Sequence, residues 1–233
     1  MRRTFTYTTK DAKENIVQSI LSPEELLTLA SYEQIGAQRA KRRSDIYWWG
    51  EKFCHFAEFI GYGLILDIGC GHGNDAIMFE QDALYRYIGI DMSWTMMKLA
   101  RTQAPNALFT QMNMYQLGFQ SQCFDGFWAA ASLLHIPKSR INAAFMEIKR
   151  VMKPDAIGFI ALREGDTEEM VIKDLRGDNR FYAFYRQEEF FCVLKRNGFE
   201  VLHADKDMRE YESAKPNIHN AWLTFIVRCL ETV

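Results

Sequence analysis

The chain has 233 residues, of which 48% are hydrophobic and 25% charged, and this is enough apolar material for one α/β domain with a sizeable core. Its formal net charge of −2 gives no general field for nucleic acid or anionic lipid, and no stretch is apolar enough for a membrane span or an export signal, so we expect a cytoplasmic protein. The five cysteines are widely spaced and predict neither a disulfide framework nor a zinc site.

Residues 1–62 are expected to form a helical segment that covers the rest of the same domain. In the stretch "SPEELLTLASYEQIGAQRAKRR", Ser22 can cap a helix and Glu25 completes a capping box. A second helix is predicted within residues 44–61, where apolar side chains recur at helical spacing and Gly61 stands where a helix would stop. Both helices should pack over the neighbouring domain.

From residue 63 onward the chain alternates between predicted strands and helices. Such alternation indicates parallel strands joined by right-handed crossovers, and therefore a doubly wound sheet with helices on both faces. The last two predicted strands have no helix between them, which favours antiparallel pairing. Residues 63–233 are thus expected to form an α/β domain with a mostly parallel seven-stranded sheet whose last strand is antiparallel. The predicted strands are 64–68, 85–90, 108–112, 124–131, 156–163, 199–207 and 221–230, and the predicted helices are about 74–80, 94–103, 138–152 and 187–198.

The stretch "LILDIGCGHGND", residues 64–75, indicates a ligand-binding turn. An apolar run ends in Asp67, and glycines follow at 69, 71 and 73, where the backbone can turn sharply and a ligand can approach it. Ligands of open parallel sheets bind beyond the carboxyl ends of the strands. Asp91 ends the second predicted strand, and a carboxylate there can accept hydrogen bonds from both hydroxyls of a ribose. The pattern therefore predicts a ligand that contains a nucleoside.

Two nucleoside ligands fit this pattern to different degrees. A dinucleotide such as NAD is typically bound by G-x-G-x-x-G, but here Asn74 occupies the third glycine position. Asp67 would repel a pyrophosphate, whereas it suits a ligand that carries an ammonium and a sulfonium. S-adenosylmethionine is therefore favoured over a nicotinamide dinucleotide.

Five motifs point to one family. "LILDIGCGHGND" is similar to the "hhDhGCGxG" motif of class I S-adenosylmethionine-dependent methyltransferases, where h is apolar. "YIGIDMSWTMMKLAR", "QMNMYQLGF", "CFDGFWAAASLLHIP" and "IKRVMKPDAIGFIAL" resemble the motifs that follow in that family, in the same order. The resemblance covers roughly residues 64–230.

The resemblance implies a Rossmann-like methyltransferase fold and an enzyme that converts S-adenosylmethionine to S-adenosylhomocysteine. The aspartate and glycines of the first motif would hold the methionine end of the cofactor, Asp91 the ribose, and Ala130 would lie under the reactive centre. Asn113 stands where the family usually has an acidic residue, and its amide oxygen can still accept a hydrogen bond from the adenine amino group. The implied cofactor-binding residues are Asp67, Gly69, Cys70, Gly71, Gly73, Asp91, Met92, Asn113, Met114 and Ala130.

Several side chains are candidates for the acceptor side of the site. His135 follows the fourth predicted strand and is the candidate general base, although a histidine here can instead hydrogen-bond locally and shape its loop. Tyr32 resembles a tyrosine that some relatives place near the cofactor. Tyr47 and Trp48 are candidates for the pocket wall, because Trp49 is the one of the three that fits a helical core face.

Two groups of basic residues have open interpretations. The run "RAKRR", ending at Arg43, suits a solvated helix end but could also contact RNA. Between residues 163 and 186, a stretch too irregular to assign, basic and aromatic side chains can either bind an anionic or aromatic substrate or secure their own loop. These side chains are Arg163, Arg180, Tyr182, Tyr185 and Arg186.

These patterns predict an enzyme that transfers a methyl group to an oxygen, nitrogen or sulfur atom of a small molecule. Methyl transfer depends on placing the acceptor atom behind the methyl group, and a hydroxyl acceptor also gains from a base. A tRNA or protein methyltransferase and a non-catalytic cofactor-binding interaction module remain the alternatives. We expect no metal and no membrane partner, and the sequence does not predict the oligomeric state.

Overall fold

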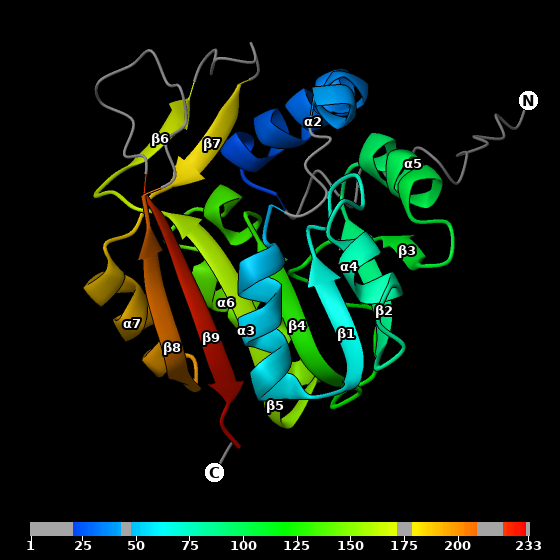
Figure 1. The fold of residues 1–233 in the computed structure, drawn as a ribbon. Helices are drawn as coiled ribbons and strands as arrows, with labels where there is room; N and C mark the ends of the chain where they lie inside the picture. The colour runs from blue at the N-terminus through cyan, green and yellow to red at the C-terminus, as the bar shows by residue number, and fades with distance from the viewer. Residues whose placement is uncertain (1–20, 43–47, 172–178, 209–220, 232–233) are drawn as a thin grey trace, which may run out of the picture.

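The computed structural model describes residues 21–42, 48–171, 179–208 and 221–231. Seven strands form one sheet in the order β3-β2-β1-β4-β5-β9-β8 (Figure 1). β9 is antiparallel to both of its neighbours and the other pairs are parallel, so the predicted fold class is confirmed. The strands are β1 Gly63–Ile68, β2 Tyr85–Asp91, β3 Leu108–Gln111, β4 Phe124–Ala130, β5 Met152–Arg163, β8 Phe199–Asp207 and β9 Trp222–Cys229.

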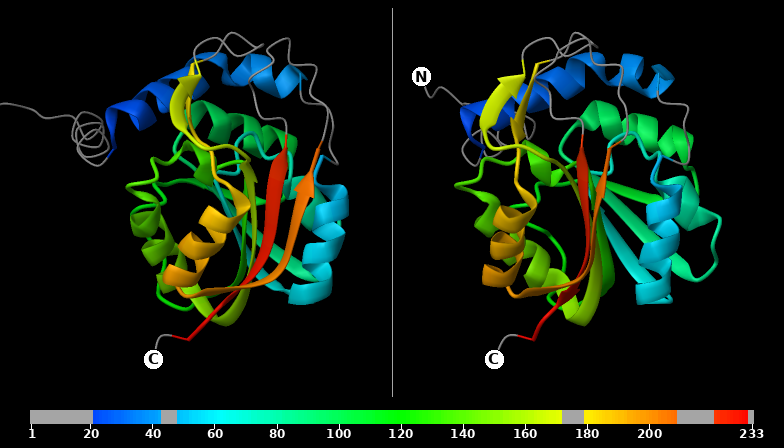
Figure 2. Two further views of the ribbon diagram at one scale, coloured as in Figure 1. Left: turned by 90° about the vertical axis from the view of Figure 1, so that its left-hand side faces the viewer. Right: turned by 60° about the vertical axis from the view of Figure 1, so that its left-hand side comes forward.

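Helices cover both faces of the sheet. α3 lies on one face and α6 and α7 lie on the other (Figures 1 and 2). The helices are α2 Pro23–Arg42, α3 Gly50–Ile60, α4 Ala76–Glu80, α5 Trp94–Gln103, α6 Ile141–Val151 and α7 Gln187–Arg196, with a 3-10 turn η1 Leu133–His135. No described helix is both long enough and apolar enough to cross a membrane.

Two predicted boundaries differ from the structure by three residues or more. The helix predicted over 138–152 begins only at Ile141. The strand predicted over 156–163 begins four residues earlier, at Met152, because this residue pairs with Phe124 before the register shifts. The prediction missed this start because Pro154 and Asp155 interrupt the apolar pattern.

An aromatic cluster under α3 joins the N-terminal helical segment to the sheet. Phe56 is fully buried, with its ring 5.4 Å from that of Trp128 and 6.4 Å from that of Phe79. Trp128 in turn stacks on Phe159 of β5 at 3.9 Å. Offset and edge-to-face ring contacts of this kind add to the free energy of burial. α3 is therefore part of the main hydrophobic core.

α2 lies in a different place from α3, across the carboxyl ends of the strands (Figure 2). Its predicted capping box is confirmed, since Ser22 N–H donates to Glu25 Oε2 at 2.7 Å and Glu25 N–H donates to Ser22 Oγ at 3.3 Å. The Glu25 carboxylate also accepts from the Tyr115 hydroxyl and pairs with Arg140. These contacts anchor the first turn of α2 to loops that follow β3 and β4.

The stretch after β5 that the sequence left unassigned contains a second, two-stranded sheet. β6 Glu168–Val171 and β7 Arg180–Ala183 pair in antiparallel fashion beside α2 (Figure 1). On the edge of β7, the Phe181 N–H donates to Thr28 Oγ1 of α2 at 2.9 Å, and the Phe181 carbonyl accepts from His135 Nδ1 at 2.6 Å. The two-stranded sheet is thus fastened to α2 and to η1.

The cluster under α3 tests whether the N-terminal segment folds together with the sheet. Phe56→Ala should lower the free energy of unfolding by about 3–5 kcal/mol, because it leaves a cavity among buried rings. Phe59, on the same helix, is 42% exposed, and Phe59→Ala should change the free energy by no more than about 0.5 kcal/mol. Urea unfolding followed by circular dichroism measures both. Equally small effects, or two separate transitions, would show that α3 is not part of one cooperative unit.

Candidate functional site

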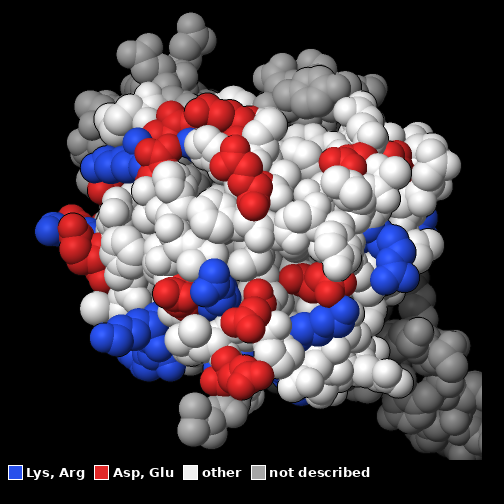
Figure 3. Space-filling model, turned by 60° about the horizontal axis from the view of Figure 1, so that its bottom comes forward, with Lys and Arg blue, Asp and Glu red and all other residues white. Residues whose placement is uncertain are grey.

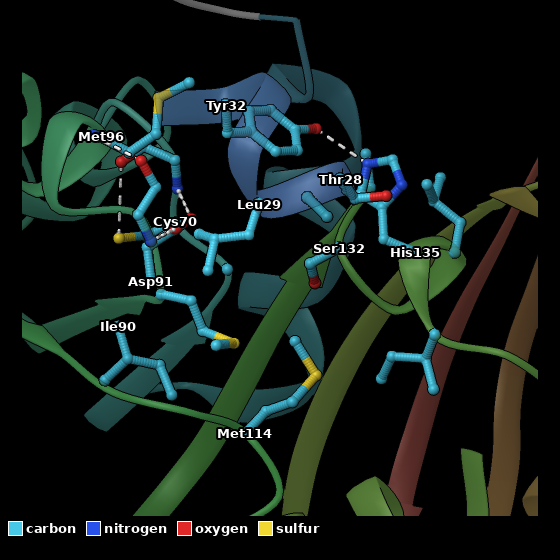
Figure 4. A pocket seen from close by; sticks show the side chains of 18 of the residues that line it. Thr28, Leu29, Tyr32, Cys70, Ile90, Asp91, Met96, Met114, Ser132 and His135 are labelled. Carbon is cyan, nitrogen blue, oxygen red and sulfur yellow. Dashed lines mark hydrogen bonds between the residues drawn. The ribbon is translucent and has the colours of Figure 1, made fainter. Parts of the chain in front are cut away.

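A cavity lies at the carboxyl ends of the central strands, beneath α2 and beside β7 (Figure 4). The strand order reverses between β1 and β4, which is where open α/β sheets bind ligands. Nine of the ten predicted cofactor-binding residues line this cavity. They are Asp67, Gly69, Cys70, Gly71, Asp91, Met92, Asn113, Met114 and Ala130.

The three glycines of the turn after β1 serve different purposes. All three have positive φ, from 56° to 79°. A Cβ on Gly69 would lie 2.4 Å from Ser132 Cβ, and a Cβ on Gly73 would lie 2.9 Å from the Cα of Ala100 in α5. A Cβ on Gly71 would meet nothing within 4 Å. Gly71 therefore leaves space open for a ligand, whereas Gly73, which does not line the cavity, permits packing against α5.

Asp91 ties the end of β2 to this turn. Its Oδ2 accepts from the Gly71 N–H at 3.0 Å and its Oδ1 accepts from the Ser93 N–H at 2.8 Å. An ionised carboxylate offers about four acceptor positions, so two remain for the hydroxyls of a ribose. Burial raises the pKa of Asp91 from 3.8 to about 6, against the lowering effect of these two backbone hydrogen bonds.

Asp67 forms the floor of the cavity at the end of β1. It is 2% exposed and accepts from the Tyr87 hydroxyl at 2.5 Å, a contact that the sequence did not predict. Burial raises the pKa of Asp67 well above its usual value, and the nearby charge of Asp75 raises it further. A cationic ligand would favour the ionised form of Asp67, so the floor suits a positively charged ligand.

Asn113 is oriented differently from the sequence-based expectation. Its Oδ1 accepts from the Tyr115 N–H at 2.9 Å, and its Nδ2 is buried with no hydrogen-bond partner among the described residues. The available group is therefore a donor, which is complementary to a ring nitrogen of an adenine. The expected role of the amide oxygen as acceptor of the adenine amino group is weakened, because that oxygen already serves the backbone of its own loop.

A tyrosine and a histidine meet on the opposite side of the cavity (Figure 4). His135 Nδ1 lies 2.6 Å from the Phe181 carbonyl oxygen, which can only accept, so Nδ1 carries the proton of the neutral ring. His135 Nε2 is then the acceptor for the Tyr32 hydroxyl at 2.8 Å. Both residues line the cavity. The imidazole is thus held as a base that faces the cavity together with Tyr32.

The tryptophan that lines the cavity is not the one that the sequence suggested. Trp49 lines the cavity as well as the core, while Trp48 does not line it and Tyr47 lies outside the described residues. Helical periodicity did not identify Trp49 as a wall residue, because Trp49 immediately precedes α3 and is not inside the helix. Its ring lies 5.1 Å from that of Trp222, at the cavity end of the sheet. Trp222 was not singled out from the sequence, since its strand reads simply as apolar.

The basic and aromatic side chains after β5 also fall into two groups. Arg163, Arg180 and Tyr182 line the cavity. Tyr185 is fully buried away from it, and Arg186 pairs with Asp166 on the surface. Among the residues that the structure describes, no group of three His, Cys, Asp or Glu side chains could hold a metal ion. The side chains of the basic run that ends at Arg43 lie outside the described residues.

Comparison with known proteins shows that the chain is similar to methyltransferases. The family model of a methyltransferase domain matches residues 65–155. The chain is 27% identical over 168 residues to the O-methyltransferase rstn1 of Aspergillus nomiae, covering 66% of this chain and 71% of the relative. It is 26% identical over 168 residues to the ubiquinone/menaquinone biosynthesis C-methyltransferase UbiE of Campylobacter jejuni, covering 59% of this chain and 71% of the relative.

A solved structure shares the fold over most of its length. It is the 1,6-didemethyltoxoflavin-N1-methyltransferase of Burkholderia thailandensis, with bound 1,6-didemethyltoxoflavin and S-adenosylhomocysteine. The TM-score is 0.67 at 17% identity, and the match covers 91% of this chain and 92% of the other.

The different surroundings of Gly71 and Gly73 lead to opposite expectations for two similar variants. Gly71→Ala should cost only about 1–2 kcal/mol of stability, for a left-handed backbone with a side chain, yet weaken S-adenosylhomocysteine binding by about tenfold or more because its Cβ enters the ligand space. Gly73→Ala should destabilise the fold more, since its Cβ collides with α5. Thermal unfolding and calorimetric titration measure both properties. Unchanged ligand affinity in Gly71→Ala would contradict this account.

The raised pKa of Asp91 predicts how ligand binding depends on pH. Its carboxyl is ionised above a pKa of about 6 and protonated below it, and only the ionised form accepts from two hydroxyls. Affinity for S-adenosylhomocysteine should fall about tenfold per unit below about pH 6. Calorimetry across this range measures the change, and Asp91→Asn should bind weakly without it. A wild-type affinity that does not fall with pH would refute the role of Asp91.

Proposed function

We propose that the chain is a class I S-adenosylmethionine-dependent methyltransferase, and that it methylates a small organic molecule at an atom that loses its proton to the Tyr32–His135 pair. S-adenosylmethionine supplies an electrophilic methyl group on a sulfonium. The protein has to bind the donor, exclude bulk water and align the acceptor atom for an in-line displacement. The rate of methyl transfer rises further if the protein accepts the proton that a hydroxyl acceptor releases.

The donor is proposed to occupy the half of the cavity next to β1 and β2. There Asp91 would accept the ribose hydroxyls and Asp67 would favour the positively charged methionine portion. Asn113 Nδ2 would donate to the adenine ring, and Ala130, at the end of β4, would lie under the reactive centre. The other proposed donor contacts are Gly69, Cys70, Gly71, Met92 and Met114.

The observation that carries the proposal is the hydrogen-bonded chain from Tyr32 through His135 to Phe181. It opens into the same cavity as Asp91, so a base and a donor site face one space. As the acceptor oxygen bonds to the methyl group, its proton passes to the Tyr32 oxygen while the Tyr32 proton passes to His135 Nε2. The Phe181 carbonyl then stabilises the imidazolium through Nδ1. Charge and protons balance, with the positive charge of the donor ending on His135.

A small acceptor is favoured by the cover over the cavity. α2 and the β6–β7 sheet lie across the carboxyl ends of the strands, which leaves less room for a tRNA or a folded protein than an uncovered sheet edge would (Figure 2). On the opposite end of the molecule basic and acidic side chains are intermixed, whereas nucleic-acid sites typically gather basic residues (Figure 3). The 1,6-didemethyltoxoflavin held by the structural relative is also a small molecule.

The acceptor class is tested by transfer of a radiolabelled methyl group. Purified protein and labelled S-adenosylmethionine are incubated with phenols, alcohols, amines, thiols, total tRNA or protein extract. Label should enter a small hydroxyl compound. Label in tRNA or protein alone would contradict the small-molecule proposal, and tight S-adenosylhomocysteine binding without any transfer would favour a non-catalytic module.

The role of the Tyr32–His135 pair is tested with the best acceptor from that screen. His135→Gln should lower kcat by about 100- to 10,000-fold, and Tyr32→Phe should also lower kcat, while the affinity for S-adenosylhomocysteine stays at the wild-type value. Tyr62→Phe is the matched control, because Tyr62 is 74% exposed and does not line the cavity. Near-normal kcat in His135→Gln would mean that the pair only shapes its loop.

A further inference from the structure

One buried hydroxyl group in the cavity wall has no role in the mechanism above. Ser132 follows β4, lines the cavity and is only 6% exposed. Its hydroxyl oxygen is buried and has no hydrogen-bond partner within the described part of the chain. Burying a polar group without a partner costs free energy, so such a group requires a physical reason. A ligand that completes the hydrogen bond supplies that reason.

The backbone that leads to Ser132 is strained. Ala131 has a φ of 59°, in the left-handed region that residues with a side chain rarely adopt. Two hydrogen bonds hold this segment: the Ala131 N–H donates to the Ala161 carbonyl of β5 at 3.1 Å, and the His135 N–H donates to the Ser132 carbonyl at 3.0 Å. Strain that the surrounding structure maintains at a cavity wall points to a functional demand on the position of Ser132.

Ser132 packs directly against the glycine turn after β1. A Cβ on Gly69 would lie 2.4 Å from Ser132 Cβ and 3.3 Å from Ser132 Oγ. Gly69 therefore admits Ser132 to this turn because it has no side chain. Among the side chains of the cavity, Ser132 lies between Cys70 of the turn and His135 (Figure 4). The hydroxyl is thus placed where the turn meets the loop that carries the proposed base.

The charges around the turn favour one group of the methyl donor as the partner of Ser132. The amino acid end of S-adenosylmethionine carries an ammonium and a carboxylate. Asp67, two residues before Gly69, and Asp91 line this part of the cavity, and their negative charges attract the ammonium and repel the carboxylate. An ammonium has three N–H donors, so a hydroxyl oxygen can accept from it in addition to a carboxylate.

We propose that the Ser132 hydroxyl accepts a hydrogen bond from the ammonium of the methyl donor, and that this bond positions the methionine end of the donor between the glycine turn and η1. The inference rests on the proposed function, because it assigns the methionine end of S-adenosylmethionine to the turn after β1. Ser132 is then a donor-binding residue that lies outside the set implied by the sequence. The same loop carries His135, so the bond also ties the donor to the proposed base.

Three ligands separate the groups of the donor in a calorimetric titration. S-adenosylhomocysteine carries the whole amino acid end, decarboxylated S-adenosylhomocysteine keeps the amine and lacks the carboxylate, and 5′-methylthioadenosine lacks both. Ser132→Ala should weaken binding of the first two by about tenfold or more, as expected for one hydrogen bond to a charged group. It should change the affinity for 5′-methylthioadenosine by no more than about twofold.

Thermal unfolding of the ligand-free protein separates this role from a structural one. Ser132→Ala removes a buried hydroxyl without a partner among the described residues, so the Tm should stay the same or rise. Ser121→Ala is the matched control, because Ser121 is exposed and does not line the cavity. Asp91→Asn should weaken all three ligands, since they share the ribose. If Ser132→Ala does not fold, Ser132→Cys decides the question, because a thiol is a weak acceptor of similar size.

The inference fails if Ser132→Ala binds S-adenosylhomocysteine as tightly as the wild type does, or if it loses affinity for 5′-methylthioadenosine to the same extent. It also fails if the loss vanishes with the decarboxylated ligand, because the hydroxyl would then serve the carboxylate, or if the Tm of the ligand-free variant falls. In each of these cases a wild type that binds S-adenosylhomocysteine leaves the proposed function intact. A wild type that binds none of the three ligands would overturn the proposed function together with this inference.

Discussion

The hydrogen bond from the Gly71 N–H to Asp91 Oδ2 is the contact on which the cavity depends. It joins the turn after β1 to the end of β2, two parallel neighbours whose carboxyl ends meet at one edge of the sheet. The turn has positive φ at each glycine, and it is held between Ser132 on one side and α5 on the other. Because a Cβ on Gly71 would meet nothing within 4 Å, the backbone of the turn lies open to a ligand. The position of the turn is set by Asp91, Ser132 and α5.

A second set of contacts determines the acceptor side. The Phe181 N–H donates to Thr28 Oγ1 of α2, and the Phe181 carbonyl accepts from His135 Nδ1 of η1. One residue of β7 therefore positions the helix that carries Tyr32 and sets the tautomer of the histidine that Tyr32 contacts. The β6–β7 sheet thus organises the proposed base as well as covering the cavity, and we infer that loss of either contact would loosen both.

The two buried carboxyls of the cavity, Asp67 and Asp91, favour a positively charged donor. Burial makes ionised Asp67 and Asp91 unfavourable in the ligand-free protein, as the raised pKa values of both carboxyls indicate. A cationic donor relieves this unfavourable burial, because it stabilises the ionised carboxylates.

The sequence by itself determined the seven-stranded sheet, the glycine turn and the placement of Asp67 and Asp91, because strand periodicity and glycine spacing are local properties. Only the tertiary structure decided which partners these residues have. Tyr32 and His135 are 103 positions apart, so no local pattern could reveal their hydrogen bond. The β6–β7 sheet was equally hidden, since its strands are short and are stabilised by α2 and η1. The separate role of Gly73 and the orientation of Asn113 likewise follow from packing against chain segments that fold back onto them.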